Sequence, residues 1–273
     1  MYQVGIDIGS SAAKTVVLRD GEIWKTMEMA TGFSSRKTAD EIYEWLEKEQ
    51  VAGEGTRYGA TGYGRVSVPY ADKVITEITC HGKGAWKLFG KDGVVIDIGG
   101  QDTKGIVLKS GRVMKFVMND KCSAGTGKFL EVMTNRLGLT QKELSELASQ
   151  GKDVTISSMC TVFAESEVIS LIGKGTSRED IAYGVVESVA VKVAQLISQL
   201  GGNHYFLTGG LCEDEYVISR LSHALNCTCG KYAFSKICRS NRGGVVVRGI
   251  KNSFQRINHR EILREHHKYQ EEL

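Results

Sequence analysis

The sequence has almost no proline: Pro69 is alone among 273 residues, while glycine occurs 32 times. This composition excludes a proline-rich linker or a low-complexity protein and indicates turns that are built from glycine. Runs of 18 or more apolar residues are also lacking, and Asp7 interrupts the first apolar stretch. We therefore expect no membrane span, no secretory leader and a soluble, cytoplasmic protein.

An excess of charge is lacking as well. The 35 Lys and Arg residues oppose 32 Asp and Glu residues, which leaves a net charge of +3 and gives no support to a nucleic-acid or membrane partner. Seven cysteines in a chain of this length are too sparse and irregular for a secreted disulfide scaffold, so we expect free thiols or metal ligands. The length and the hydrophobic content of 41% favour two domains.

An internal repeat organises the chain. Residues 6–18 read IDIGSSAAKTVVL and residues 96–108 read IDIGGQDTKGIVL, so the same phrase returns later in the chain. Each copy has an apolar strand, an Asp, a glycine turn and a second apolar run, which predicts a β-hairpin. One copy alone would fit a hairpin whose glycines only satisfy turn geometry. Two copies with the Asp in register predict two related domains.

These turns have the chemistry of a nucleotide site. A carboxylate at a strand end can hold Mg²⁺ through water, and backbone N–H groups of a glycine turn can cradle phosphate together with the hydroxyls of Ser10, Ser11 and Thr103. Facing copies would clamp one nucleotide between two domains. A third element, the short strand 205–207, leads into Thr208-Gly209-Gly210, where glycine lets an adenosine ribose and α-phosphate approach the backbone.

The remaining pattern is α/β. Apolar residues at helical spacing predict six helices, at residues 38–50, 76–88, 127–137, 140–150, 163–172 and 178–200. The last helix follows Ser177-Arg178-Glu179-Asp180, a capping-box pattern that defines its start. Strands alternate with these helices, so we expect sheets that carry helices on their faces.

Two cysteines stand in glycine- or serine-rich segments just before predicted helices. Cys122 lies in NDKCSAGTGK (119–128) and Cys160 lies in SSMCTVFAESE (157–167). A helix N-terminus stabilises a thiolate or a negatively charged cluster, although burial as a small apolar residue is the commoner role of a free cysteine. Both interpretations stay open at this point.

Two thiolates cannot complete a site of four ligands. A twofold dimer that contributes Cys122 and Cys160 from each chain supplies four sulfurs, which suits one [4Fe–4S] cluster on the axis. Cys227 and Cys229 form the rival pair, and we interpret them as packing residues because alternate residues of a strand share one face. Cys80 and Cys212 are likewise expected to pack.

The motifs resemble a known family. The two Asp-Ile-Gly turns and Thr-Gly-Gly resemble the actin, hexokinase and Hsp70 ATPase superfold, which implies two related ribonuclease-H-like α/β domains. The segments 119–128 and 158–167 resemble the activators of 2-hydroxyacyl-CoA dehydratases, which belong to the ATPase family that also includes subunits of benzoyl-CoA reductase. The similarity covers about residues 3–236, including TGYGR (61–65) and TEITCHG (76–82).

The resemblance implies an anaerobic, oxygen-sensitive homodimer with one bridging [4Fe–4S] cluster on Cys122 and Cys160. A ferredoxin or flavodoxin would reduce the cluster, and ATP hydrolysis would drive one electron to a 2-hydroxyacyl-CoA dehydratase or a related reductase. Asp7 and Asp97 would hold Mg²⁺ through water, and Gln101 would position the attacking water. The other residues expected around ATP are Gly9, Ser10, Ser11, Lys14, Gly99, Gly100, Thr103, Lys104, Thr208, Gly209 and Gly210.

Other functions stay open. An ATPase subunit of a benzoyl-CoA-reductase-like system is the alternative within the family. A small-molecule kinase of the same superfold would need a carboxylate that orients its substrate and would have no use for the two cysteines. A nucleotide-gated interaction module would leave the thiols inert. Iron and sulfide analysis after anaerobic purification separates the activator, with about four irons per dimer, from the kinase and the interaction module, which would have none.

The C-terminal part departs from the family. We expect a first ATPase domain over 1–91, completed in the family by a C-terminal helix, a second domain over 92–236 with the cluster cysteines, and an atypical tail over 237–273. Residues 236–243 can be encoded so that the reading frame one base later gives Tyr-Ala-Gly-Ala-Ile-Gly, which resembles the family's final helix. A single-base frameshift is our hypothesis, and a divergent tail with a polar helix over about 253–272 is the alternative; the gene's nucleotide sequence decides between them.

Overall fold

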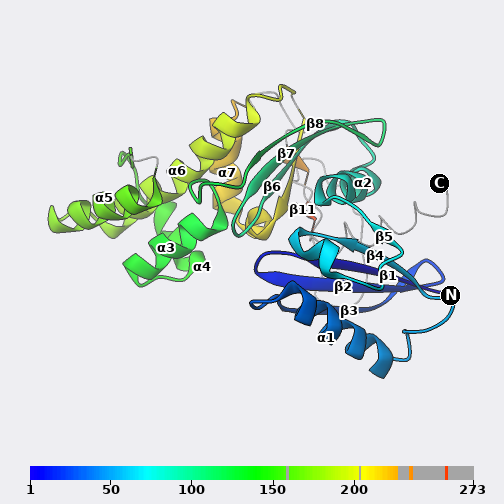
Figure 1. Ribbon diagram of the computed structural model, residues 1–273. Helices are drawn as coiled ribbons and strands as arrows, with labels where there is room; N and C mark the ends of the chain where they lie inside the picture. The colour runs from blue at the N-terminus through cyan, green and yellow to red at the C-terminus, as the bar shows by residue number, and fades with distance from the viewer. Residues whose placement is uncertain (158–159, 203, 227–233, 236–255, 258–273) are drawn as a thin grey trace. The chain divides into compact units, whose positions relative to one another are not determined.

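A computed structural model describes residues 1–157, 160–202, 204–226, 234–235 and 256–257. The chain forms two compact units, which we describe separately (Figure 1). Unit 1 contains residues 1–91 and 108–113, and unit 2 contains residues 92–107 and the described residues of 114–257. The tail 237–273, with Cys238, the proposed frameshift and its alternative polar helix, lies outside the described residues apart from 256–257, as do Cys227 and Cys229.

A five-stranded sheet in the order β3-β2-β1-β4-β5 forms the centre of unit 1. Strand β1 pairs antiparallel with β2 and parallel with β4, and β2 pairs antiparallel with β3. The strands are β1 (Tyr2–Ile8), β2 (Ala12–Arg19), β3 (Glu22–Ala30), β4 (Arg57–Thr61) and β5 (Lys73–Val74), and the helical segments are α1 (Ser35–Lys48), the 3₁₀ turn η1 (Tyr63–Ser67) and α2 (Glu77–Phe89). The hairpin predicted for residues 6–18 is confirmed.

Apolar periodicity explains how unit 1 packs. Helix α1 begins at its N-cap Ser34, whose side chain accepts a hydrogen bond from the Lys37 N–H, and it buries Ile42 and Leu46. These side chains join one buried cluster with Val4, Ile6 and Ile8 of β1 and Val17 of β2. Because the residues of β1 are buried up to Asp7 and Ile8, the strand brings a carboxylate to its end in a fixed position.

Unit 2 has a six-stranded sheet, in the order β10-β9-β6-β7-β8 with β11 also paired to β9. Its strands are β6 (Gly93–Ile98), β7 (Thr103–Lys109), β8 (Arg112–Asn119), β9 (Tyr205–Gly209), β10 (Phe234–Ser235) and β11 (Arg256–Ile257). Its helical segments are α3 (Gly127–Leu137), α4 (Gln141–Ala148), α5 (Thr161–Gly173), α6 (Arg178–Ile197), the 3₁₀ turn η2 (Gly210–Glu213) and α7 (Glu215–Ala224). Strand β6 is parallel to β9.

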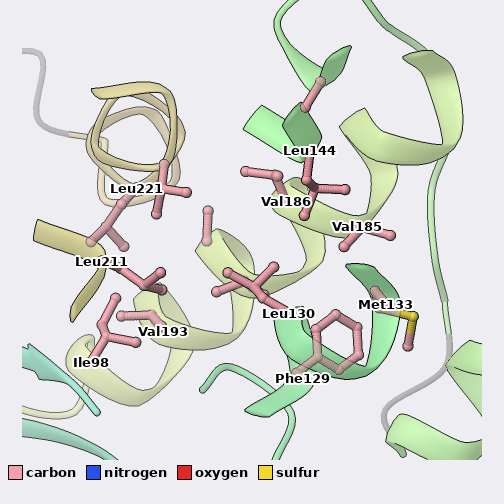
Figure 2. Packing of buried hydrophobic residues seen from close by; sticks show 14 of the residues in the cluster. Ile98, Phe129, Leu130, Met133, Leu144, Val185, Val186, Val193, Leu211 and Leu221 are labelled. Carbon is pink, nitrogen blue, oxygen red and sulfur yellow. The ribbon is translucent and has the colours of Figure 1, made fainter. Parts of the chain in front are cut away.

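Helix α6 lies at the centre of the unit 2 core. Its buried Val185, Val186 and Val193 belong to one cluster with residues of α3, α4, α7 and β6 (Figure 2). A helix that contacts several elements is expected to be apolar over much of its surface, and ten residues of α6 are buried. This core fixes the ends of β6 and β9 and the start of α3 relative to one another within unit 2.

The predicted helices are confirmed, with shifted boundaries. Ser177 caps α6 by accepting a hydrogen bond from the Asp180 N–H, whereas the reciprocal capping box forms between Thr140 and Glu143, at the start of α4. Helix α5 begins at Thr161, two residues earlier than expected. Helix α7 was not predicted, although its N-cap Asp214 and its buried Val217, Ile218 and Leu221 carry a helical signal. Within the part described, no helix is both long and apolar enough to cross a membrane.

Candidate nucleotide and cluster sites

The first repeat forms a tight turn at the end of β1. The Gly9 N–H donates to the Ala12 carbonyl (3.1 Å), and the Thr31 hydroxyl donates to the Gly9 carbonyl (2.7 Å). Asp7 is 4% exposed at the strand end, whereas Ser10 and Ser11 are exposed. The turn therefore offers backbone and hydroxyl groups to solvent above a buried carboxylate, as a phosphate site requires.

A second strand end lies beside this carboxylate. Thr61, the last residue of β4, is the register partner of Asp7, and Gly62 follows with φ +84°. A methyl group at Gly62 would collide with Oδ1 of Asp7, so only glycine fits here. The Arg65 guanidinium donates to the Gly62 carbonyl (2.9 Å) and braces the turn.

The second repeat forms the same turn in unit 2. The Gly99 N–H donates to the Asp102 carbonyl (2.8 Å), which is the position equivalent to Ala12. Asp97 is 5% exposed, and Gly100 and Gln101 are exposed. Strand β9 brings Thr208 into register with Asp97, as β4 brings Thr61 to Asp7.

The chemistry around the second carboxylate is ionic. Lys104 is buried, and its ammonium lies 2.8 Å from Oδ2 of Asp102 and 3.6 Å from Oδ2 of Asp97. The Thr208 hydroxyl donates to Oδ1 of Asp97 (3.0 Å). Lys14, the equivalent of Lys104, is half-buried and forms no ion pair with the residues that the structure describes.

Two of the predicted ATP contacts, Thr103 and Thr208, have buried hydroxyls that are hydrogen bonded within unit 2. Thr103 is 1% exposed and its hydroxyl donates to the Gly125 carbonyl (2.6 Å), so it holds the loop before α3. Thr208 is fully buried and holds Asp97. Both side chains therefore position other groups in this conformation, because the one proton of each hydroxyl is already committed.

A cavity of about 700 Å³ lies beside the Thr-Gly-Gly segment. Gly210 contributes to its wall, and the remaining lining comes from α4 and the residue after it and from α7 and the residue before it: Gln141, Lys142, Ser145, Glu146, Ser149, Asp214, Glu215 and Tyr216. The Ser145 hydroxyl donates to the Asp214 carboxylate and joins the two walls. This volume is in the range of small-molecule sites.

The two predicted cluster cysteines are exposed free thiols in unit 2. Cys160 is the N-cap of α5, as expected of a thiol at a helix start. Cys122 instead precedes the α3 N-cap, Thr126, by four residues and lies in a loop. The Asn119 side chain holds that loop: its amide donates to the Cys122 carbonyl (2.8 Å) and its oxygen accepts from the Cys122 N–H (3.2 Å).

The segments that carry the two cysteines are in contact. The hydroxyls of Ser123 and Thr161, each the neighbour of a cysteine, are hydrogen bonded at 2.7 Å. A cavity of about 490 Å³ opens beside Cys122, with Lys121 and Lys192 in its wall. Cys80 and Cys212 are buried, which confirms their predicted packing role.

Within the described residues, no three His, Cys, Asp or Glu side chains gather into a group that could hold a metal ion. Two thiols of one chain are half of a four-sulfur ligand set. The candidate residues lie in three places: the unit 1 turn with Asp7, the unit 2 turn with Asp97, and the segments that carry Cys122 and Cys160.

Sequence reasoning missed several of these residues. Asp102 differs from Ala12 within the aligned repeat, and this difference was the available signal. Thr61-Gly62, within the TGYGR motif, repeats the Thr208-Gly209 arrangement, and this repetition was a second available signal. The α4 residues that line the 700 Å³ cavity carry no local signal, because only the fold brings them to Gly210.

Comparisons with known proteins agree with this geometry. Residues 4–246 match the BadF/BadG/BcrA/BcrD ATPase family. The chain belongs to this family. The (R)-2-hydroxyglutaryl-CoA dehydratase activating ATPase of Acidaminococcus fermentans is 44% identical over 230 residues, which cover 82% of this chain and 88% of that protein.

Solved structures show the same relationship. The activator of 2-hydroxyisocaproyl-CoA dehydratase from Clostridium difficile with bound ADPNP is 31% identical, with a TM-score of 0.75 over 100% of this chain and 98% of that one. A ROK family glucokinase from Streptomyces griseus is 15% identical, with a TM-score of 0.55 over 99% of this chain and 100% of that one, and shares the fold alone. The predicted actin- and hexokinase-like ATPase fold is confirmed.

Proposed function

We propose that this protein is an ATP-dependent one-electron activator of a 2-hydroxyacyl-CoA dehydratase or a related acyl-CoA reductase. One observation carries the proposal: two exposed cysteines lie on contacting segments of the unit that also holds the second phosphate turn. A kinase of the same fold has no use for such a pair. The family membership and the activator relatives support the same conclusion.

ATP is the proposed ligand of the two glycine turns. Asp7 and Asp97 would hold Mg²⁺ through water, and Lys104, whose ammonium lies 3.6 Å from Asp97, would approach the phosphate oxygens. Gln101 is exposed in the second turn and would orient the attacking water. The phosphate contacts are assigned to Gly9, Ser10, Ser11, Lys14, Gly99, Gly100 and Lys104. Gly209, Gly210 and the 700 Å³ cavity are assigned to adenosine.

A [4Fe–4S] cluster shared by two chains is the proposed redox group. Cys122 and Cys160 fit it because both are exposed thiols, and four sulfurs require a second copy. When bound, the cluster carries one electron at a time. Asn119 holds the backbone of Cys122 on both sides, so this chain presents one sulfur from a braced loop and the other from a helix start.

Helix α5 supports a homodimer. It buries only Ala164 and Val168, while Phe163 is 67% exposed and Ile172 is 48% exposed. A largely apolar helix ordinarily lies in a protein interior, and a twofold contact covers such a surface with its own copy. Because Cys160 begins this helix, the same contact would bring the cysteines of two chains together. A ferredoxin or flavodoxin donor and the dehydratase acceptor complete the proposal.

Iron analysis after anaerobic purification tests this function. We expect about four iron and four sulfide per dimer, and ATP hydrolysis without an added phosphate acceptor. Cys122→Ser and Cys160→Ser should lose the iron and the cluster absorbance but keep ATP binding. Cys212→Ala, which removes a buried thiol of the same unit, is the matched control and should keep both. Full cluster absorbance in both serine variants would refute the ligand assignment.

A further inference from the structure

The start of α3 is hydrogen bonded to the second phosphate turn. The Gly127 N–H donates to the Gly99 carbonyl (2.9 Å) and the Lys128 N–H donates to the Gly100 carbonyl (2.7 Å). The first N–H groups of a helix have no partner within the helix, and here two of them are bound by the turn. A displacement of Gly99 and Gly100 is therefore passed directly to the helix start.

The loop before α3 carries this connection to Ser123. Both the hydroxyl and the N–H of Thr126 donate to the Ser123 carbonyl, at 2.7 and 3.0 Å. Since Thr126 is the residue before Gly127, the position of Ser123 follows that of the helix start. Thr103 strengthens the same loop by its buried hydrogen bond to Gly125.

Ser123 in turn reaches the second cysteine segment. Its hydroxyl is hydrogen bonded to that of Thr161, the first residue of α5 and the neighbour of Cys160. A different link between α3 and α5 lies further along both helices, where the Arg136 guanidinium donates to the Glu165 carboxylate (2.8 Å) on the exposed surface. The first link joins the loop before α3 to the start of α5 and adjoins the cysteines, whereas the second joins the two helices away from them.

We propose that the hydrogen bond between Ser123 and Thr161 positions Cys160 and transmits the state of the Gly99–Gly100 turn to it. This inference rests on the proposed function, because it takes the turn as the phosphate site. Ser123 and Thr161 are positioning residues: they act on the sulfur of Cys160 through the backbone. Removal of either hydroxyl leaves the Cys122 loop attached to the turn and deletes the hydrogen bond between that loop and the start of α5.

Thiol reactivity tests the proposal without a cluster. The full chain, freed of iron by chelation and kept anaerobic, is alkylated with iodoacetamide with and without ADPNP and Mg²⁺, and the rates at Cys122 and Cys160 are measured by peptide mass spectrometry. One neutral hydrogen bond biases an equilibrium by about two- to tenfold, so we expect the nucleotide to change the Cys160 rate by about that factor.

Four variants isolate the contact. Ser123→Ala and Thr161→Val should abolish the nucleotide effect at Cys160 and retain the effect at Cys122. Thr161→Ser keeps a hydroxyl and should restore the effect at Cys160, and Arg136→Ala, the matched control, should leave both effects unchanged.

Three results would refute the proposed coupling between the turn and Cys160. It is refuted by a wild-type Cys160 rate that does not respond to bound nucleotide, by a full response in Ser123→Ala or Thr161→Val, and by an equal loss in Arg136→Ala. Calorimetry on the same samples separates the two proposals: absence of nucleotide binding refutes both, whereas binding with an unresponsive Cys160 refutes only the coupling.

Discussion

The two glycine turns of the repeat have the same backbone hydrogen bond and different electrostatics. Each has a buried Asp at a strand end, a partner strand that ends in Thr-Gly, and a glycine N–H that closes the turn. In unit 2 the Asp97 carboxylate lies near the buried Lys104 ammonium and accepts from Thr208. In unit 1 the equivalent Lys14 forms no ion pair with described residues, and the buried Thr61 hydroxyl has no hydrogen bond of normal geometry.

One position accounts for much of this difference. Asp102 in unit 2 corresponds to Ala12 in unit 1, and Asp102 lies 2.8 Å from the Lys104 ammonium. A lysine is buried only when carboxylates compensate its charge. Two copies of one motif therefore need not share a chemical role: a second carboxylate nearby decides whether the lysine is buried in an ion pair.

The largest expected effect concerns the two lysines. Lys104→Ala leaves two buried carboxylates without their cation, and breaking a buried ion pair costs about 3–5 kcal/mol of unfolding free energy. Lys14→Ala removes a half-buried side chain without an ion pair and should cost less than about 1 kcal/mol. Urea denaturation of both variants measures the difference. Equal losses would show that the two turns are electrostatically alike.

The two Thr-Gly corners, Thr61-Gly62 and Thr208-Gly209, should lose similar amounts of stability when the glycine is replaced. A methyl group at Gly62 collides with Asp7, and one at Gly209 collides with the Ile98 carbonyl, both at positive φ. We expect Gly62→Ala and Gly209→Ala each to lose about 2–4 kcal/mol in urea denaturation. Gly138→Ala is the control, because Gly138 also has positive φ but open space around it; it should lose about 1 kcal/mol. A loss of stability in only one of the two variants would show that the two corners do not respond alike.

Replacement of the two threonines, Thr61 and Thr208, should give a smaller difference in unfolding free energy. Thr208→Val removes the hydrogen bond to Asp97 and should cost about 1–2 kcal/mol. Thr61→Val replaces an unsatisfied buried hydroxyl by a group of the same shape, so its effect should be neutral or slightly stabilising. Chemical denaturation at pH 7 compares them. A destabilised Thr61→Val would mean that this hydroxyl has a partner in solution.

At neutral pH the smallest effect concerns a thiol beside the first turn. Burial raises the pKa of Cys80 from 9.0 to about 12, with smaller contributions in the same direction from the neighbouring Asp7 and Glu77 carboxylates. The folded state thus keeps the neutral thiol, and unfolding stability should fall as the pH rises from about 9 to about 12, because the unfolded chain ionises first. Cys80→Ala should flatten that dependence in denaturation at several pH values. If Cys80→Ala shows the same dependence of stability on pH as the wild type, the raised pKa of Cys80 is contradicted.

Local patterns explain what the sequence could predict. The repeat predicted both hairpins because strand alternation and glycine turns are encoded within a few residues, and the helices followed from apolar spacing. The ion pair of Lys104 could not be predicted, since its burial depends on the whole unit. Cys122 was expected at a helix start, but it lies in a loop that the side chains of Asn119 and Thr126 hold through hydrogen bonds to its backbone.

The hydrogen bonds from Gly127 and Lys128 to the second turn use only main-chain atoms. Side-chain replacement at Lys128 leaves its N–H donor in place, whereas a Cβ at Gly127 would lie 3.2 Å from the Gly99 carbonyl oxygen and press on the turn. Proline is the exception, since it has no N–H group. Helices ordinarily accept proline at their first residue, yet here that residue is Gly127. Homologues that keep the contact should therefore vary freely in polarity at 128 while excluding proline from both positions.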